Sequence, residues 1–305
     1  VRDHLKTFLW ELDRREHERG APLFVKREFQ RFVRCGVLAH GFARFRCTDC
    51  GTDRLVAFSC KGRGFCPSCG GRRMTERAAH LVDHVLPRAP VRQWVLSLPF
   101  ELRYRLAWDH ALCRAVLAVY TRALQSFYRK QAKASGHRDG RTGTVAVIQR
   151  FGGALNLNVH FHTLAVDRVF VREPDGSLSF AAAKAPTDEE VETLLGGFDL
   201  HANTSVRAKN RPKLERLWRY LLRPPIAEDR LSPAPDGSVR VRLKTPWRDG
   251  TSHIALQPPE LLEKLAALIP RPYVNLIVYH GVLAPNAKWR REVVAFGRLQ
   301  FERPS

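Results

Sequence analysis

Hydrophobic and polar positions follow two periods along the chain, and together they predict a protein of mixed helix and strand. Apolar residues three or four apart predict helices over 1–34, 77–85, 102–130, 212–222 and 258–268, and a capping box at Thr187 to Glu190 predicts the start of another. Short apolar runs bounded by turn residues predict strands over 93–98, 144–151, 155–171, 239–243, 251–256 and 274–279. Turns such as Gly152-Gly153 join neighbouring strands into hairpins. The expected fold class is therefore α+β, with a mainly antiparallel central sheet flanked by helices.

The strand pattern at residues 157–166, LNVHFHTLAV, places two histidines on one face. His160 and His162 are two residues apart, so their side chains point the same way, roughly 7 Å apart along the strand. The opposite face is an apolar set suited to a core, made of Val159, Phe161, Thr163 and Ala165. Two imidazoles on one rigid face can share a divalent metal. An ordinary strand with two half-buried histidines fits this pattern equally well.

The net charge of the chain indicates which class of partner the protein binds. The chain has 305 residues, 44% of them hydrophobic, and 51 Lys and Arg oppose 30 Asp and Glu, which gives +21 and a pI near 10.4. Such an excess attracts a polyanion, and nucleic acid is the leading class of partner. An acidic membrane surface is the alternative, but no long apolar span and no basic amphipathic helix with a clean apolar stripe supports a membrane. Without a signal-peptide pattern, a cytoplasmic, nucleoid-associated location is expected.

Five of the seven cysteines lie between residues 47 and 69. Two Cys-x-x-Cys pairs, Cys47 with Cys50 and Cys66 with Cys69, have the spacing of a four-thiolate zinc site, and a glycine follows each pair. Cys60 is either a spare thiol near the metal or a replacement for one of the four. The isolated Cys35 and Cys113 are interpreted as small buried apolar residues. A disulfide framework is the alternative, and a reducing compartment disfavours it.

Basic residues surround these cysteines and make the module a candidate DNA-contact domain. The candidate contacts are Arg63, Arg72 and Arg73. A small structural module that packs on its neighbour is the alternative reading. The expected boundary lies near Ala89-Pro90, so residues 1–89 form a small helical, zinc-knuckle domain ahead of the sheet.

A second group of residues places a tyrosine on a basic helix. Tyr220 has three arginines nearby that could hold phosphates beside its hydroxyl, namely Arg216, Arg219 and Arg223. Alone, such a tyrosine is typical of a helix rim with a solvated hydroxyl. A histidine pair on a sheet together with a helical tyrosine fits a DNA-nicking enzyme. The metal would polarise a phosphate oxygen, and the tyrosine would attack phosphorus to form a phosphotyrosine.

Four blocks of the chain resemble the insertion sequence ninety-one family of rolling-circle transposases. Residues 58–74 resemble its amino-terminal zinc-binding domain, and residues 158–164 resemble its HUH motif (His, bulky apolar residue, His). Residues 220–231 and 279–289 resemble two further blocks, so the similarity covers roughly 5–290. The resemblance implies an HUH-type catalytic domain over 90–290 and a Mg²⁺- or Mn²⁺-dependent endonuclease and strand transferase. Its substrate would be DNA, preferentially single-stranded transposon ends, with His160 and His162 as metal ligands and Tyr220 as nucleophile.

Two departures from the family pattern bear on these expectations. Some family members carry a second tyrosine four residues earlier, where this chain has Arg216, so a single-tyrosine cycle is expected. The family commonly extends further at both ends, and this chain begins at Val1, so we expect a truncated copy with a divergent tail at 291–305. A third metal ligand is usual in such sites, and the sequence does not identify it; Gln149 is one candidate, and His253 and His280 are two others.

Two other functions compete with DNA nicking and strand transfer. The chain could be a non-catalytic, zinc-dependent DNA-binding protein derived from a truncated transposase, because composition and cysteine spacing fit that equally well. A metal-dependent hydrolase of a small substrate fits the positive charge poorly. The sequence does not predict an oligomeric state.

Overall fold

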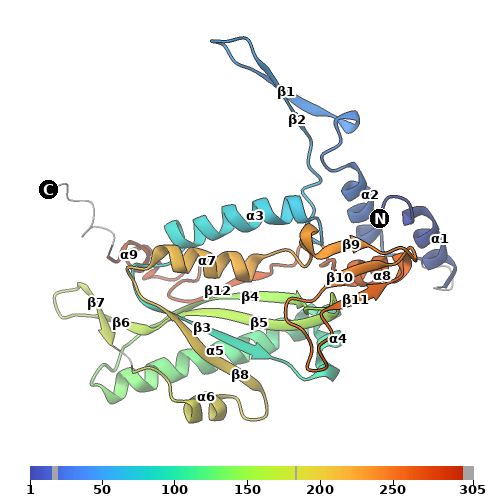
Figure 1. Cartoon of the computed structure of the whole chain (residues 1–305). Helices are drawn as coiled ribbons and strands as arrows, with labels where there is room; N and C mark the ends of the chain where they lie inside the picture. Colours follow the sequence, from blue (N-terminus) through green and yellow to red (C-terminus); the bar gives the residue numbers. More distant parts are fainter. Residues whose placement is uncertain (16–19, 183, 298–305) are drawn as a thin grey trace. The chain divides into compact units, whose positions relative to one another are not determined.

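The computed structural model describes residues 1–15, 20–182 and 184–297, and the chain forms two units that each combine distant segments (Figure 1). The first unit comprises Val1–Met74, Phe151–Leu157 and Arg223–Tyr273. The second comprises Thr75–Arg150, Asn158–Leu222 and Val274–Ser305. The predicted boundary near residue 89 does not coincide with this division. The first change of unit falls inside helix α3 (Pro67–His80), and two later segments return to the first unit.

A five-stranded sheet organises the second unit. Its order is β12-β4-β5-β3-β8, and β12–β4, β5–β3 and β3–β8 pair antiparallel. The strands are β3 (Val91–Ser97), β4 (Gly143–Phe151), β5 (Leu157–Val166), β8 (Asp199–Val206) and β12 (Ile277–Gly281). The predicted strand with the two histidines is β5, near the middle of the sheet. The expected mixed fold with a mainly antiparallel sheet is confirmed.

Helices cover both faces of this sheet (Figure 1). On the histidine face, Leu164 and Val166 share one apolar cluster with Trp218 and Leu221 of α7 (Arg211–Leu222). On the other face, α5 (His110–Ala134) stacks the ring of Tyr120 on Phe161, with centroids 6.2 Å apart. The strand residues predicted to face a core, including Phe161, are buried. The histidines therefore lie on a strand whose backbone is packed from both sides.

Several predicted elements are divided in the structure for local reasons. The predicted helix over 102–130 is two helices, α4 (Phe100–Trp108) and α5, because Asp109 caps α5 by accepting a hydrogen bond from Leu112 N at 2.9 Å. The predicted strand over 155–171 is β5 followed by β6 (Arg168–Arg172), which pairs with β7 (Leu178–Ala182). The predicted capping box at Thr187 is confirmed, and it starts α6 (Asp188–Leu194).

Three further elements complete the second unit. The predicted helix over 77–85 is the end of α3 continued by a π-helical turn, Leu81–Val85. Helix α9 (Arg290–Ala295) buries Val293 in the core of this unit, so the predicted divergent tail begins inside a packed helix. Residues 298–305 of that tail lie outside the described residues. No described helix combines the length and apolar character needed to cross a membrane.

The first unit is built on three helices with a shared apolar core. Phe8 of α1, Phe29 of α2 and Leu262 of α8 belong to that core, and the ring of Phe65 packs 4.9 Å from that of Phe29. The three helices are α1 (Leu5–Arg15), α2 (Leu23–Arg34) and α8 (Pro258–Leu268). Two small antiparallel sheets and two short 3-10 helices complete the unit. Their bounds are Phe42–Arg46 (β1), Asp53–Ala57 (β2), Leu231–Pro233 (β9), Val239–Arg242 (β10), His253–Leu256 (β11), Leu38–His40 and Glu228–Arg230.

Candidate functional site

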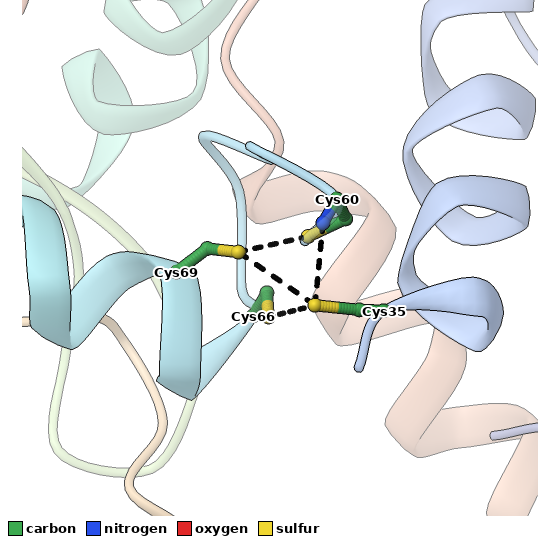
Figure 2. A group of neighbouring side chains, drawn as sticks. All are labelled: Cys35, Cys60, Cys66 and Cys69. Carbon is green, nitrogen blue, oxygen red and sulfur yellow. Dashed lines mark hydrogen bonds between the residues drawn. The ribbon is translucent and has the colours of Figure 1, made fainter. Parts of the chain in front are cut away.

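Four cysteine sulfurs converge in the first unit (Figure 2). Cys35 caps the carboxyl end of α2, Cys60 lies in the loop after β2, and Cys66 and Cys69 lie at the amino end of α3. The sulfur of Cys35 is 3.8 Å from that of Cys66 and 3.7 Å from that of Cys69, and the Cys60 and Cys69 sulfurs are 3.4 Å apart. All four sulfurs lie within 4.8 Å of one another. Three segments of the chain thus meet at one four-sulfur centre.

The spacing of these sulfurs fits a tetrahedral zinc ion. Zinc–thiolate bonds of about 2.3 Å in a tetrahedron place the sulfurs about 3.8 Å apart, close to the separations here. Backbone amides support the negative charge of the ligands: Cys60 N donates to Cys35 Sγ, and Gly62 N donates to Cys60 Sγ, both at 3.3 Å. The amino end of α3 also favours anionic sulfur at Cys66 and Cys69. The four residues would hold a structural zinc ion.

The thiols of this cluster differ in acidity. Burial raises the pKa of Cys60 and raises that of Cys66 to about 11. At Cys69 burial acts in the same direction, but hydrogen bonds from Cys60 and Cys35 outweigh it and lower the pKa to about 7. Metal binding requires deprotonated thiols. Cys69 is therefore more readily available as a thiolate at neutral pH than Cys60 or Cys66.

The ligand set differs from the one predicted, because Cys35 and Cys60 take the positions expected for Cys47 and Cys50. Cys47 and Cys50 are exposed in the turn that joins β1 to β2. Each strand has five residues, and an extended run of that length spans about 16 Å, which carries the turn away from the cluster. Hydrogen bonds with Thr52 lower the pKa of Cys50 to about 7. Cys47 and Cys50 thus form a separate, exposed pair.

The predicted DNA-contact arginines of this unit fall into two groups. Arg63 and Arg72 are exposed. Arg73 is half-buried and donates to the carbonyls of Gly62 at 2.8 Å and Lys61 at 3.0 Å, so it braces the loop between Cys60 and Cys66. Arg73 has a clear structural role in the cysteine loop, while its contact with DNA stays a prediction.

The histidine pair in the second unit has converging side chains. His160 Nε2 and His162 Nε2 are 3.1 Å apart, and their ring planes are inclined at 73°. His162 is buried, and His160 is half-buried. Two nitrogens bound at right angles to one ion, each at about 2.1 Å, are about 3 Å apart. The pair therefore has the separation that a shared metal requires.

Neighbouring groups fix the orientation of both rings. His160 Nδ1 lies 3.0 Å from the carbonyl oxygen of Asn158 and donates to it, which leaves Nε2 as the acceptor. His162 Nδ1 lies 3.1 Å from Nε2 of Gln93, a buried residue of the adjacent strand β3. Sequence reasoning missed Gln93. Gln93 lies two residues along β3 from Val95, which pairs with His162, and the sequence alone does not give that pairing.

Tyr220 lies beside this pair. Its ring centroid is 6.3 Å from that of His162, at an interplanar angle of 74°, and 39% of the residue is exposed. Leu214, Trp218 and Leu221 are the buried residues of α7 and hold the helix on the sheet. The structure thus brings together the predicted histidine pair and the predicted tyrosine.

Gln149, the predicted third ligand, lies on the same face of the sheet. It shares the parity of Val145 and Val147 on β4, which belong to the apolar cluster under α7. Its Nε2 donates to the carbonyl of Leu221 at 3.1 Å. Its Oε1 is buried and has no hydrogen-bond partner within the described parts of the chain. A bound cation would supply the partner that this buried oxygen lacks.

The two alternative histidine ligands lie elsewhere. His280 on β12 pairs with Thr144 and so faces the opposite side of the sheet, where burial lowers its pKa. His253 is exposed on β11 in the first unit, with Nδ1 2.9 Å from Ser252 Oγ.

The arginines near Tyr220 differ in their surroundings. Arg216 is exposed on α7, and Arg219 forms an ion pair with Glu215 at 2.7 Å. Arg223 follows the end of α7 and belongs to the first unit, where its guanidinium lies 5.4 Å from the ring centroid of Phe151.

Comparisons with known proteins match part of each unit to transposases. Residues 5–98 match the family model described as a transposase zinc-binding domain, which includes all four clustered cysteines. Residues 175–291 match the model described as a putative transposase, which includes Tyr220 and begins after the histidine pair. The chain is also 24% identical over 299 residues to the transposase for insertion sequence element IS801 of Pseudomonas savastanoi pv. phaseolicola, covering 83% of this chain and 69% of that protein. No solved structure matches the chain.

These findings define a transposase with a zinc-binding domain on its amino-terminal side. More specifically, the chain belongs to the IS91 family of transposases. Membership places the protein among enzymes that process DNA during transposition.

Proposed function

We propose that the protein nicks and rejoins single DNA strands in rolling-circle transposition, through a metal-assisted phosphotyrosine intermediate. One observation carries this proposal: the His160 and His162 Nε2 atoms lie 3.1 Å apart, with the Tyr220 ring 6.3 Å from the His162 ring. A divalent ion and a nucleophile side by side are the requirements of phosphodiester cleavage. The sheet with its covering helices would then be an HUH-type catalytic domain.

The metal would be held by His160, His162 and Gln149. Mg²⁺ or Mn²⁺ is the proposed ion: Gln149 supplies an oxygen ligand, and water and phosphate oxygens would complete an octahedral shell around the two imidazoles. When bound, the ion polarises a phosphate oxygen and stabilises the charge of the transition state. Coordination through Nε2 places the proton of His162 on Nδ1. Rotation of the Gln93 amide would present Oε1 to accept that proton, so Gln93 would set the tautomer.

Tyr220 would supply the nucleophile. Its hydroxyl loses a proton and its oxygen bonds to phosphorus, while the oxygen of the neighbouring nucleotide leaves and takes up a proton as a free hydroxyl. The phosphotyrosine retains the energy of the broken bond. A hydroxyl from a second strand can then attack and release the tyrosine. Since α7 contains one tyrosine and Arg216 stands one turn earlier, we propose a cycle with a single nucleophile.

The first unit would contribute to DNA binding. Its four-cysteine site would stabilise a small module that presents Arg63 and Arg72 to the phosphate backbone of DNA. Arg216, which is exposed on α7 of the second unit, would also contact the phosphate backbone. Single-stranded transposon ends are the proposed substrate, and a nucleoid-associated location would follow from DNA binding.

Substituting Tyr220 by phenylalanine should abolish formation of a covalent protein–DNA adduct, because phenylalanine lacks the attacking oxygen. The zinc-loaded protein is incubated with single-stranded end DNA and Mn²⁺ and analysed on a denaturing gel. Tyr279→Phe is the matched control, because Tyr279 lies on the same face of the sheet and should be dispensable. An adduct that persists in Tyr220→Phe would show that the nucleophile is another residue. Wild-type protein that binds DNA without forming any adduct would favour a non-catalytic DNA-binding protein.

Substituting Gln149 by alanine should raise the Mn²⁺ concentration needed for half-maximal nicking by about tenfold or more, because one ligand is lost. Gln131→Ala provides the control. The Gln131 Oε1 atom is also buried without a partner among the described residues, but it lies on α5, which covers the other face. Equal metal dependence in Gln149→Ala and wild type would exclude Gln149 as a ligand.

A further inference from the structure

Helix α4 exposes a row of aromatic rings. Phe100 is 77% exposed and Tyr104 is 69% exposed, and Trp108 follows four residues later. Residues four apart lie on one face of a helix, so these three residues form a row, the ladder, along one side of α4. The Tyr104 and Trp108 ring centroids are 6.3 Å apart, at an interplanar angle of 59°. Large exposed aromatic side chains in a row are typical of a binding surface.

The ladder is held in place at both ends. Near its start, Arg103 Nε donates to the carbonyl of Leu98 at 2.8 Å. At its end, Arg150 of β4 donates to the carbonyl of Ala107 at 2.7 Å, and its guanidinium lies 5.6 Å from the Trp108 ring centroid. Leu106 and Ala107 of the same helix are buried. The rings are thus presented by a fixed helix, which lowers the entropy lost when a ligand binds.

The ladder begins at the end of the sheet that carries His160. In the β3–β5 pairing, Ser97 lies opposite His160, and α4 starts three residues after Ser97 (Figure 1). All of these residues belong to the second unit. Arg150, which contacts Trp108, is adjacent to Gln149 on β4 and so faces away from the histidine pair, and a strand bound along the ladder would reach the pair around this end of the sheet.

We propose that Phe100 and Tyr104 form a stacking platform for unpaired bases of single-stranded DNA that leads to the histidine pair. This inference rests on the proposed function for its choice of ligand. Bases of a single strand expose their faces and stack on aromatic rings, whereas bases of a duplex stack on one another. Arg105, exposed beside Tyr104, supplies a cation for the phosphate backbone, in line with the excess of positive charge.

Binding of a fluorescent single-stranded oligonucleotide tests the proposal, measured with zinc-loaded protein and without added Mg²⁺ or Mn²⁺. Phe100→Ala and Tyr104→Ala should each weaken binding about tenfold, because each removes one stacking ring. Tyr104→Phe should restore binding, because the ring is retained. The slope of affinity against salt should stay unchanged in the ring variants and become shallower in Arg105→Ala, because that slope counts phosphate contacts.

Tyr273→Ala is the matched control, because Tyr273 is 99% exposed in the first unit. Wild-type affinity in this variant supports a specific platform. Wild-type affinity in both Phe100→Ala and Tyr104→Ala would overturn the proposal. The exposed rings would then be better explained as a binding surface for a protein partner. Since the assay needs no cleavage, loss of binding in the ladder variants would stand even if Tyr220 formed no adduct.

Discussion

Substituting Cys35 by serine is expected to remove the bound zinc and to lower the free energy of unfolding of the first unit by roughly 4 kcal/mol or more. Cys35 is the ligand that ties the end of α2 to the loop at Cys60 and the start of α3. Its loss leaves three thiols, and zinc binding coupled to folding is highly sensitive to a missing ligand. The zinc content per chain after dialysis and the thermal unfolding curve measure the two effects.

The double variant Cys47→Ser with Cys50→Ser is the control for this experiment. Both cysteines are exposed in the β1–β2 turn, so zinc content and stability should match the wild type. The opposite pattern, with zinc retained in Cys35→Ser and lost in the double variant, would restore the ligand set expected from sequence spacing.

Substituting His160 by alanine is expected to slow nicking by at least about 100-fold and to leave single-stranded DNA binding nearly unchanged. In the proposed mechanism the histidine would act on the reacting phosphate through the metal, and loss of one such electrostatic contact typically costs this much in rate. His160 is half-buried, so the fold should tolerate the change. Single-turnover nicking and DNA affinity, measured on the same preparation, separate the two effects.

His201→Ala is the control for the histidine prediction. His201 is an exposed histidine of β8 in the same sheet, and its Nε2 lies 3.0 Å from an Asp199 carboxylate oxygen. The His201→Ala variant should nick DNA at the wild-type rate. Undiminished nicking in His160→Ala would mean that the histidine pair does not hold the catalytic metal.

The candidate site in the second unit follows from local patterns, so much of it could be predicted. Strand periodicity fixes which side His160 and His162 face, and helical periodicity leaves Tyr220 outside the buried stripe of α7. The position of Gln93 depends on which strands pair, and the sequence does not state that directly. Strand β8 was missed because polar residues interrupt its apolar positions, and only Leu200, Ala202 and Val206 are buried.

The cysteine site shows the limit of spacing arguments. Cys66 and Cys69 are close in sequence and remain close in space. Cys35 reaches them across an intervening hairpin, so its role depends on how α2 packs beside the cysteine loop. The division into two units is also not visible from sequence spacing, because residues 151–157 and 223–273 join the first unit from distant positions in the chain. The ligand set of the cysteine site and the division into two units both depend on contacts between segments that are distant in the sequence.

Mapping of the covalent adduct is the most direct test of a tyrosine nucleophile beside a metal-binding histidine pair. The reaction product formed with single-stranded end DNA and Mn²⁺ is digested with nuclease and protease, and the modified peptide is sequenced by mass spectrometry. The structure predicts a single nucleotide-bearing peptide, modified at Tyr220. Modification of a different residue, or strand cleavage without any protein-bound nucleotide, would contradict the account.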